Sequence, residues 1–186
     1  LYNYDEKYLF SATIRRDGSS NFGENNRYGV FPSASFGWVA SKEDFLKDSD
    51  KISFLKVRAS WGVNGSDRIS PLSFVARIQN VFTYPFGSEV QTLNTGTALA
   101  APPNPNVRWE ESVQLDLGVE LGLFDDKVSF EADVYRKQTK DLLMTQQIPG
   151  YVGATNSPTS NLGEILNEGV EFSLGYRMGQ GDLKLN

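Results

Sequence analysis

The sequence of 186 residues contains neither cysteine nor histidine. This excludes disulfides, thiolate and imidazole metal sites, and catalysis that uses either side chain. No apolar run approaches the ~20 residues that a transmembrane helix needs. The 18 lysines and arginines are outnumbered by 23 acidic residues, and the net charge is −5. Because phosphate binding requires clustered basic residues, we expect no nucleic-acid partner. We also expect no metal or other cofactor.

Both ends of the sequence resemble strands. Residues 1–4 read Leu-Tyr-Asn-Tyr, and residues 183–186 read Leu-Lys-Leu-Asn. Nothing near the start resembles a signal peptide. We therefore interpret the chain as a piece of a longer protein.

Residues 113–134 contain the clearest pattern, a strict alternation of apolar and polar side chains. The apolar positions are Val113, Leu115, Leu117, Val119, Leu121 and Leu123, followed by Val128, Phe130, Ala132 and Val134. The intervening Phe-Asp-Asp-Lys segment is typical of a turn. Because successive side chains of a strand point to opposite sides, this pattern predicts a long β-hairpin with one apolar and one charged face.

Such a hairpin fits two architectures. In a soluble β-sandwich the apolar face would lie in the core, whereas in an outer-membrane barrel it would face lipid and the charged face would line the lumen. Each arm has about ten residues or more, the length with which a tilted strand crosses a bilayer, whereas globular strands usually have about five or six. Strand length therefore favours the membrane barrel.

The remaining pattern predicts further strands near residues 8–15, 28–41, 55–64 and 170–177. Ser41 followed by Asp44 suggests a helix cap, which predicts one helical turn over residues 42–46. A small hairpin is expected near residues 74–86. Long connections at about 17–27, 65–106 and 140–161 alternate with short ones, so consecutive antiparallel strands place all the long connections at one end. Bacterial barrels have this asymmetry, with short periplasmic turns and long extracellular loops.

Aromatic residues also favour the barrel. On the expected outer face, Tyr8, Trp38 and Tyr176 lie near the short-turn end, and Trp61 and Trp109 lie near the long-loop end. Membrane barrels carry two such girdles, where rings lie at the headgroups. The alternative is that these rings are ordinary core aromatics of a soluble β protein.

Several segments resemble the SusC/RagA family of TonB-dependent outer-membrane transporters. In family order they are Arg15 to Ser20 with Phe22-Gly23, Asn26 to Ser33, Phe36-Gly37-Trp38, Leu55 to Gly62, Asn104 to Glu110, Thr139 to Leu143 and Asn167 to Glu171. The resemblance implies an all-β fold, an antiparallel up-and-down transmembrane barrel of about 22 strands. This chain would be one part of that barrel, over residues 1–186, with the plug domain absent from it.

The resemblance also implies a location and partners. The parent protein would lie in the outer membrane of a Gram-negative bacterium and contact its lipid. It would import glycans or peptides with a SusD-like surface lipoprotein, powered by the TonB complex through the missing N-terminal region. The alternative function is that of a soluble carbohydrate-binding or adhesion β-sandwich module.

Two groups of residues are candidate sites. The first would face the lumen, where it could contact the plug or a solute, or only wet the lumen and pair internally: Arg15, Lys56, Arg58, Asp116, Glu120, Glu131, Asp133, Glu171 and Arg177. The second lies in or beside the longest loop, where it could stack on sugars or line a lipoprotein interface, or pack on itself: Phe82, Tyr84, Phe86 and Trp109.

The chain is not expected to be an enzyme. Glu110 and Glu111 could suggest the acid pair of a glycosidase, but such acids must flank one bond about 5–10 Å apart. Neighbours in a strand point to opposite faces, so these two cannot share a substrate. Asp125 and Asp126 are better explained as turn residues.

Overall fold

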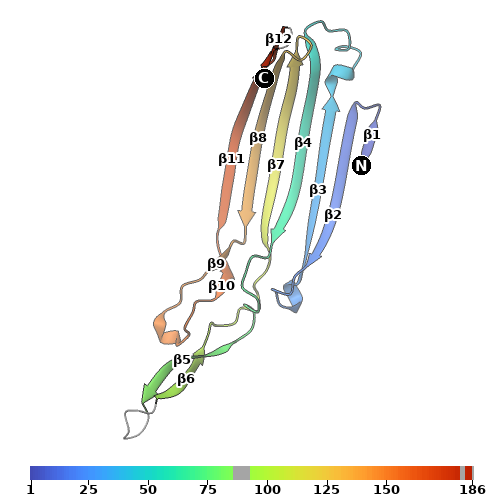
Figure 1. Ribbon diagram of the computed structural model, residues 1–186. Helices are drawn as coiled ribbons and strands as arrows, with labels where there is room; N and C mark the ends of the chain where they lie inside the picture. Colours follow the sequence, from blue (N-terminus) through green and yellow to red (C-terminus); the bar gives the residue numbers. More distant parts are fainter. Residues whose placement is uncertain (86–92, 181–182, 186) are drawn as a thin grey trace.

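The computed structural model describes residues 1–85, 93–180 and 183–185. Seven strands form one antiparallel sheet in the order β1-β2-β3-β4-β7-β8-β11 (Figure 1). Their bounds are Tyr2–Tyr4 (β1), Tyr8–Gly18 (β2), Tyr28–Val39 (β3), Ile52–Ser66 (β4), Glu110–Leu123 (β7), Val128–Lys140 (β8) and Glu164–Tyr176 (β11). Each strand pairs with the sheet strand before it in the chain, so the topology is up-and-down.

The predicted central hairpin is confirmed as β7 and β8. Leu117 lies opposite Val134 on one face, and Glu120 lies opposite Glu131 on the other. The turn between them has three consecutive residues with φ near +57°: 56° at Phe124, 56° at Asp125 and 58° at Asp126. Aspartate tolerates this left-handed conformation better than most residues, which explains the Asp-Asp pair at this position.

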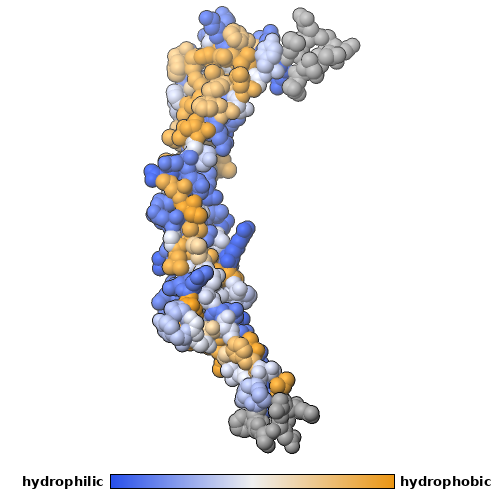
Figure 2. Space-filling model, turned by 90° about the vertical axis from the view of Figure 1, so that its left-hand side faces the viewer, coloured by the Kyte–Doolittle hydropathy of each residue, from blue (hydrophilic) through white to orange (hydrophobic). Residues whose placement is uncertain are grey.

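One face of the sheet is apolar and has no layer packed against it in the described part of the chain. Its side chains remain exposed, by 51% at Leu117, 72% at Phe172 and 76% at Leu174. Figure 2 shows hydrophobic residues gathered over the upper part of the sheet. A soluble domain buries such a face, and contiguous exposed apolar surface of this kind marks contact with a membrane or with another protein.

Three connections, which include the two longest, lie together at one end of the sheet, and the β1–β2, β3–β4 and β7–β8 connections lie at the other end (Figure 1). The first three are the β2–β3 connection (residues 19–27), the β4–β7 connection (67–109) and the β8–β11 connection (141–163). Each begins one or two residues later than the sequence pattern suggested, because the ladder continues past the last clearly alternating residue. The 3-10 helix η1 (Glu24–Asn26) lies in the first, and η3 (Gly150–Val152) lies in the third.

Short strand pairs occupy these connections and the end of the chain. β5 (Ile78–Pro85) pairs with β6 (Leu93–Leu99), so the hairpin expected near 74–86 lies further along the chain. β9 (Leu143–Thr145) pairs with β10 (Thr159–Asn161), which the alternation did not predict because three residues are too few to show a period. β12 (Met178–Gln180) pairs with β13 (Leu183–Leu185) near the end of the chain.

The helical turn predicted at 42–46 is shifted by about one residue, because the backbone N–H of Lys47 donates to the carbonyl of Glu43 at 2.9 Å. The predicted cap at Ser41 is wrong. The structure has a 3-10 helix, η2, at Ala40–Lys42, and no side chain caps it. Glu43 has extended backbone, and its carboxylate accepts hydrogen bonds from Tyr8 Oη (2.7 Å) and Trp38 Nε1 (3.2 Å). The hydrogen bond from Tyr8 is the main cause that lowers the pKa of the Glu43 carboxyl group.

None of the described helices is long and apolar enough to cross a membrane.

The buried core is small and lies where the long connections meet the sheet. Its fully buried members are Phe22 and Val107, packed with Phe31 and Trp109, and we call these four residues the aromatic cluster. The Trp109 ring lies 5.2 Å from that of Phe22 and 5.3 Å from that of Phe31. Trp109 is only 8% exposed, so its expected place on the outer face is wrong. β7 begins at Glu110, and the alternation therefore does not extend to Trp109.

Candidate functional site

The candidate site is a group of charged side chains on the polar face of the sheet, opposite the apolar face. Its centre is a row of three strands in which Arg58 of β4 lies beside Gly118 of β7, and Gly118 lies beside Asp133 of β8. Glycine has no side chain, so the Arg58 side chain can cross β7 and reach β8. A Cβ at Gly118 would collide with both the Arg58 and Asp133 side chains.

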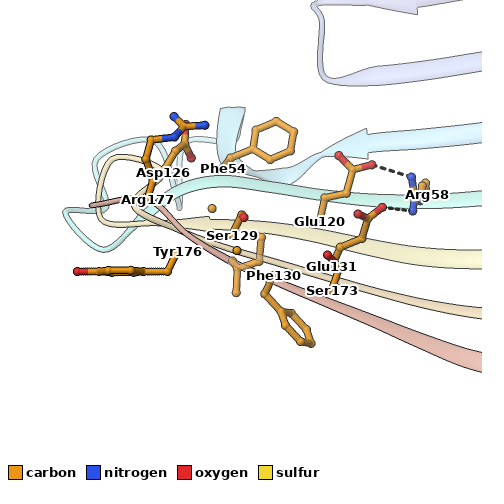
Figure 3. A pocket seen from close by; sticks show the side chains of 13 residues that line it. Phe54, Arg58, Glu120, Asp126, Ser129, Phe130, Glu131, Ser173, Tyr176 and Arg177 are labelled. Atoms are coloured by element: carbon orange, nitrogen blue, oxygen red, sulfur yellow. Dashed lines mark hydrogen bonds and ion pairs between the residues drawn. The ribbon is translucent and has the colours of Figure 1, made fainter. Parts of the chain in front are cut away.

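Arg58 bridges three acidic side chains across these strands. Its Nη1 lies 3.1 Å from Glu120 Oε1, and its Nη2 lies 2.7 Å from Asp133 Oδ2 and 2.5 Å from Glu131 Oε1. Lys56 Nζ lies 3.2 Å from Glu120 Oε1. We call these five residues the charged belt. Figure 3 shows Glu120 and Glu131 pointing to the same guanidinium.

Acidic groups exceed basic ones on this part of the face. Asp116 accepts hydrogen bonds from Ser60 Oγ (3.1 Å) and Gln114 Nε2 (2.9 Å) rather than from a cation. Glu171 lies beside Asp133 in the ladder. With these two residues, five carboxylates face the two cations of the charged belt. Among the residues that the structure describes, no three acidic side chains are grouped to hold a metal ion.

An open hollow of about 810 Å³ lies on the polar face toward the short turns. Charged-belt residues line one side of it, and its other lining residues include polar ones, such as Ser129, Ser173 and Arg177, and the aromatic Phe54, Phe130 and Tyr176 (Figure 3). Arg177 follows β11, and its backbone N–H donates to the carbonyl of Lys127 at 2.7 Å. A concave surface with this mixture of charges and hydroxyls can hold water, a polar solute or a polar protein surface.

Arg15 does not join the charged belt. It lies nearer the long connections, where its Nε is 2.7 Å from Asp17 Oδ2 and its guanidinium carbon is 5.8 Å from the Phe31 ring centroid. The alternation in the sequence placed Arg15 on the same face as Arg58. It did not specify the position of either residue along the strands. The structure therefore separates the polar-face candidates into two groups. One is the charged belt with its neighbours, and the other is Arg15, which pairs with Asp17.

The loop aromatics are also divided. Phe82 is 61% exposed and Tyr84 is 48% exposed, and both lie on β5. Trp109 lies in the aromatic cluster instead, so it is not an exposed contact residue. Phe86 lies outside the described residues.

Sequence reasoning missed the contacts that join the three long connections. Asp67 Oδ2 accepts from Ser19 Oγ at 2.6 Å, which ties the β4–β7 connection to the β2–β3 connection. Arg108 binds Asp141 through two hydrogen bonds of 3.1 and 2.7 Å, which ties the β4–β7 connection to the β8–β11 connection. The Asp141 hydrogen bond is the main cause that raises the pKa of Arg108. The β4–β7 connection therefore holds the other two.

One signal for the aromatic cluster was present in the sequence. Phe31 falls on the polar face by parity, beside positions occupied by Gly29 and Gly65. A Cβ at either glycine would collide with the Phe31 ring, which lies across both positions. An aromatic residue on a polar face, two positions after a glycine of the same strand, could therefore have suggested a packed ring.

Replacing Gly118 with alanine should displace the Arg58 side chain. We expect the full-length parent protein to lose about 1–3 kcal/mol of stability, the usual cost of inserting atoms into packed structure. The matched control is Gly37→Ala, because Gly37 lies beside Arg58 on β3 and a Cβ there makes contacts of 3.6 Å or more. Urea unfolding in detergent micelles measures both variants, and equal unfolding midpoints would contradict the crossing of β7 by Arg58.

The whole chain, residues 1–186, matches the family TonB dependent receptor-like, beta-barrel. It is 43% identical over 176 residues to TonB-dependent receptor P3 of Formosa agariphila, covering 95% of this chain and 17% of that protein. It is 35% identical over 180 residues to TonB-dependent receptor SusC of Bacteroides thetaiotaomicron, covering 93% of this chain and 17% of SusC.

Solved structures show the same likeness. The structure of the RagAB peptide importer in its 'closed-closed' state superposes with a TM-score of 0.82 and 27% identity, covering 96% of this chain and 19% of the matched chain. The 'open-open' state gives a TM-score of 0.79. The chain thus spans less than a fifth of the length of these relatives. The predicted fold class, an antiparallel up-and-down barrel segment, is confirmed, and the sheet is not closed within this chain.

Proposed function

The chain belongs to the TonB-dependent receptor-like β-barrel family, with SusC and RagAB among its relatives, and from this premise we propose its role. It forms part of the barrel wall of an outer-membrane transporter that imports glycans or peptides. The apolar face contacts lipid, and the polar face lines the lumen. Phe82 and Tyr84 contact the substrate or a partner, and the parent protein works with a SusD-like lipoprotein and the TonB complex.

The observation that carries this proposal is the contrast between the two faces of the sheet. The apolar face is uncovered although its side chains are large, while the opposite face holds the charged belt and the hollow of about 810 Å³. A lipid-facing barrel wall requires this distribution. The soluble sandwich alternative requires a second layer over the apolar face, and the described part of the chain supplies none.

The partners and substrates rest on the relatives. RagAB is described as a peptide importer, and SusC as a TonB-dependent receptor. Phe82 and Tyr84 are exposed residues of β5, and β5 lies at the end of the sheet that holds the long connections (Figure 1). The barrel topology directs this end out of the cell. This end is where an extracellular solute or a surface lipoprotein would arrive first.

Surface labelling tests the location and the orientation together. The chain has no cysteine, so single cysteines can be placed in a parent protein that lacks other thiols. Tyr151, in the β8–β11 connection, is 90% exposed, and Asp125 is exposed in the β7–β8 turn. We expect a membrane-impermeant maleimide to label Tyr151→Cys on intact cells and Asp125→Cys only after the outer membrane is permeabilised.

The control is the cysteine-free parent, which should take up no reagent. Labelling of Asp125→Cys alone on intact cells would invert the proposed orientation. Equal labelling of both variants in a protein that stays soluble after ultracentrifugation would support a soluble module instead.

A further inference from the structure

A second cavity lies outside the polar face, between the two longest connections. It has a volume of about 340 Å³, within the range of small ligand sites. Backbone hydrogen bonds join its walls, from Thr155 N–H to Leu99 O at 3.0 Å and from Asn156 N–H to Ala100 O at 2.7 Å. We call it the loop cleft. Because its walls are already connected, binding there would not require ordering of both connections.

The loop cleft combines one cation with aliphatic and uncharged polar side chains. Arg77 is its only charged lining residue, and in the described part of the chain Arg77 makes no ion pair. Ser73, Gln79 and Asn156 provide hydroxyl and amide groups, whereas no aromatic residue lines the cleft. An exposed guanidinium beside such groups suits a carboxylate, which it can bind through two parallel hydrogen bonds.

Leu72 gives an independent indication of function. Its φ is +62°, in the left-handed region that leucine rarely adopts. Its side chain lines the loop cleft and remains 48% exposed, so the strained backbone does not serve to bury it. Val75 and Ile78 are also exposed and line the same cleft. Residues with such strained backbone cluster at functional sites, ligand clamps among them.

We propose that the loop cleft binds the carboxylate end of a peptide, with the carboxylate on Arg77 and an aliphatic side chain against Leu72. Main-chain amides of the peptide meet the hydroxyl and amide side chains of the cleft. A sugar ring would lack an aromatic surface on which to stack. This inference rests on the proposed import function and gives its substrate class as peptides, with the loop cleft as a subsite on the outer side.

The test is isothermal titration of the full-length parent protein in detergent micelles with the tripeptide alanyl-alanyl-leucine. We expect the free acid to bind at least tenfold more tightly than its C-terminal amide, because the amide cannot accept the charge-assisted pair from Arg77. Arg77→Gln should remove this difference, so that acid and amide bind equally. Arg68→Gln is the matched control, since Arg68 is exposed in the same connection but does not line the cleft, and it should bind as the unaltered protein does.

Further ligands separate the other sources of a carboxylate. A peptide amide with an internal glutamate that binds as tightly as the free acid would overturn the assignment to the peptide end. Arg77-dependent binding of a trigalacturonate without binding of the tripeptide would overturn the assignment to peptides. Equal binding of acid and amide by the unaltered protein would overturn the proposal as a whole. Surface labelling at Tyr151→Cys is independent of these results, so failure of the cleft and failure of the transporter assignment are distinguishable.

Discussion

Replacing Leu117 with arginine should sharply lower the folded yield of the full-length parent protein. Leu117 lies in the middle of β7 on the apolar face and is 51% exposed in the chain. An arginine at mid-depth on the lipid face of a barrel costs about 2–4 kcal/mol, and less near the interfaces. Val113→Arg, nearer the long-connection end, should therefore reduce the yield less. The folded fraction is measured by heat-dependent migration in detergent gels.

Asp116→Asn is the matched control, because Asp116 is the neighbour of Leu117 on the polar face. A wet lumen tolerates either side chain, so this variant should fold normally. A buried protein core would also reject arginine at Leu117, and nitroxide labels separate the two cases. A label on Leu117→Cys should be relaxed more by oxygen than by a water-soluble nickel chelate, and a label on Asp116→Cys should show the reverse order. A Leu117→Cys label shielded from both reagents would contradict contact with lipid.

The second large effect is expected at Trp109. Replacing Trp109 with alanine removes a buried ring that packs against Phe22 of the β2–β3 connection and Phe31 of β3. Truncation of a buried tryptophan costs about 3–5 kcal/mol. We expect a loss of stability of this size and faster proteolysis of the β2–β3 connection, because the packing that holds it against the β4–β7 connection is lost.

Trp109→Phe is the matched control for this variant. The Trp109 Nε1 atom is buried and has no hydrogen-bond partner among the described residues. Phenylalanine keeps most of the ring and removes this unsatisfied donor, so its cost should be well below that of alanine. Urea unfolding and limited proteolysis of the parent protein measure both variants. A Trp109→Ala variant with unchanged stability but weaker substrate binding would instead support the sequence-based interpretation of Trp109 as a contact residue.

Much of the sheet could be predicted because alternation is a local property. The partners of Leu117 and Glu120 across the β7–β8 turn follow from the period of two and the position of the turn residues. The same parity placed Arg58, Glu120, Glu131 and Asp133 on one face, which the register of β4, β7 and β8 agrees with. Short strands such as β9 and β10 were missed because three residues cannot show a period.

The contacts between distant parts of the chain could not be derived in this way. Arg58 reaches Asp133 because β4 pairs with β7 at a register that brings Gly118 between them, and no local pattern specifies that register. Trp109 enters the aromatic cluster because it lies just before β7, which begins at Glu110, and because the β2–β3 connection brings Phe22 against it. The period of two thus assigned each side chain to one face of the sheet. The pairing of strands far apart in sequence determined the position of each side chain along the strands, and so determined which charges and rings are in contact.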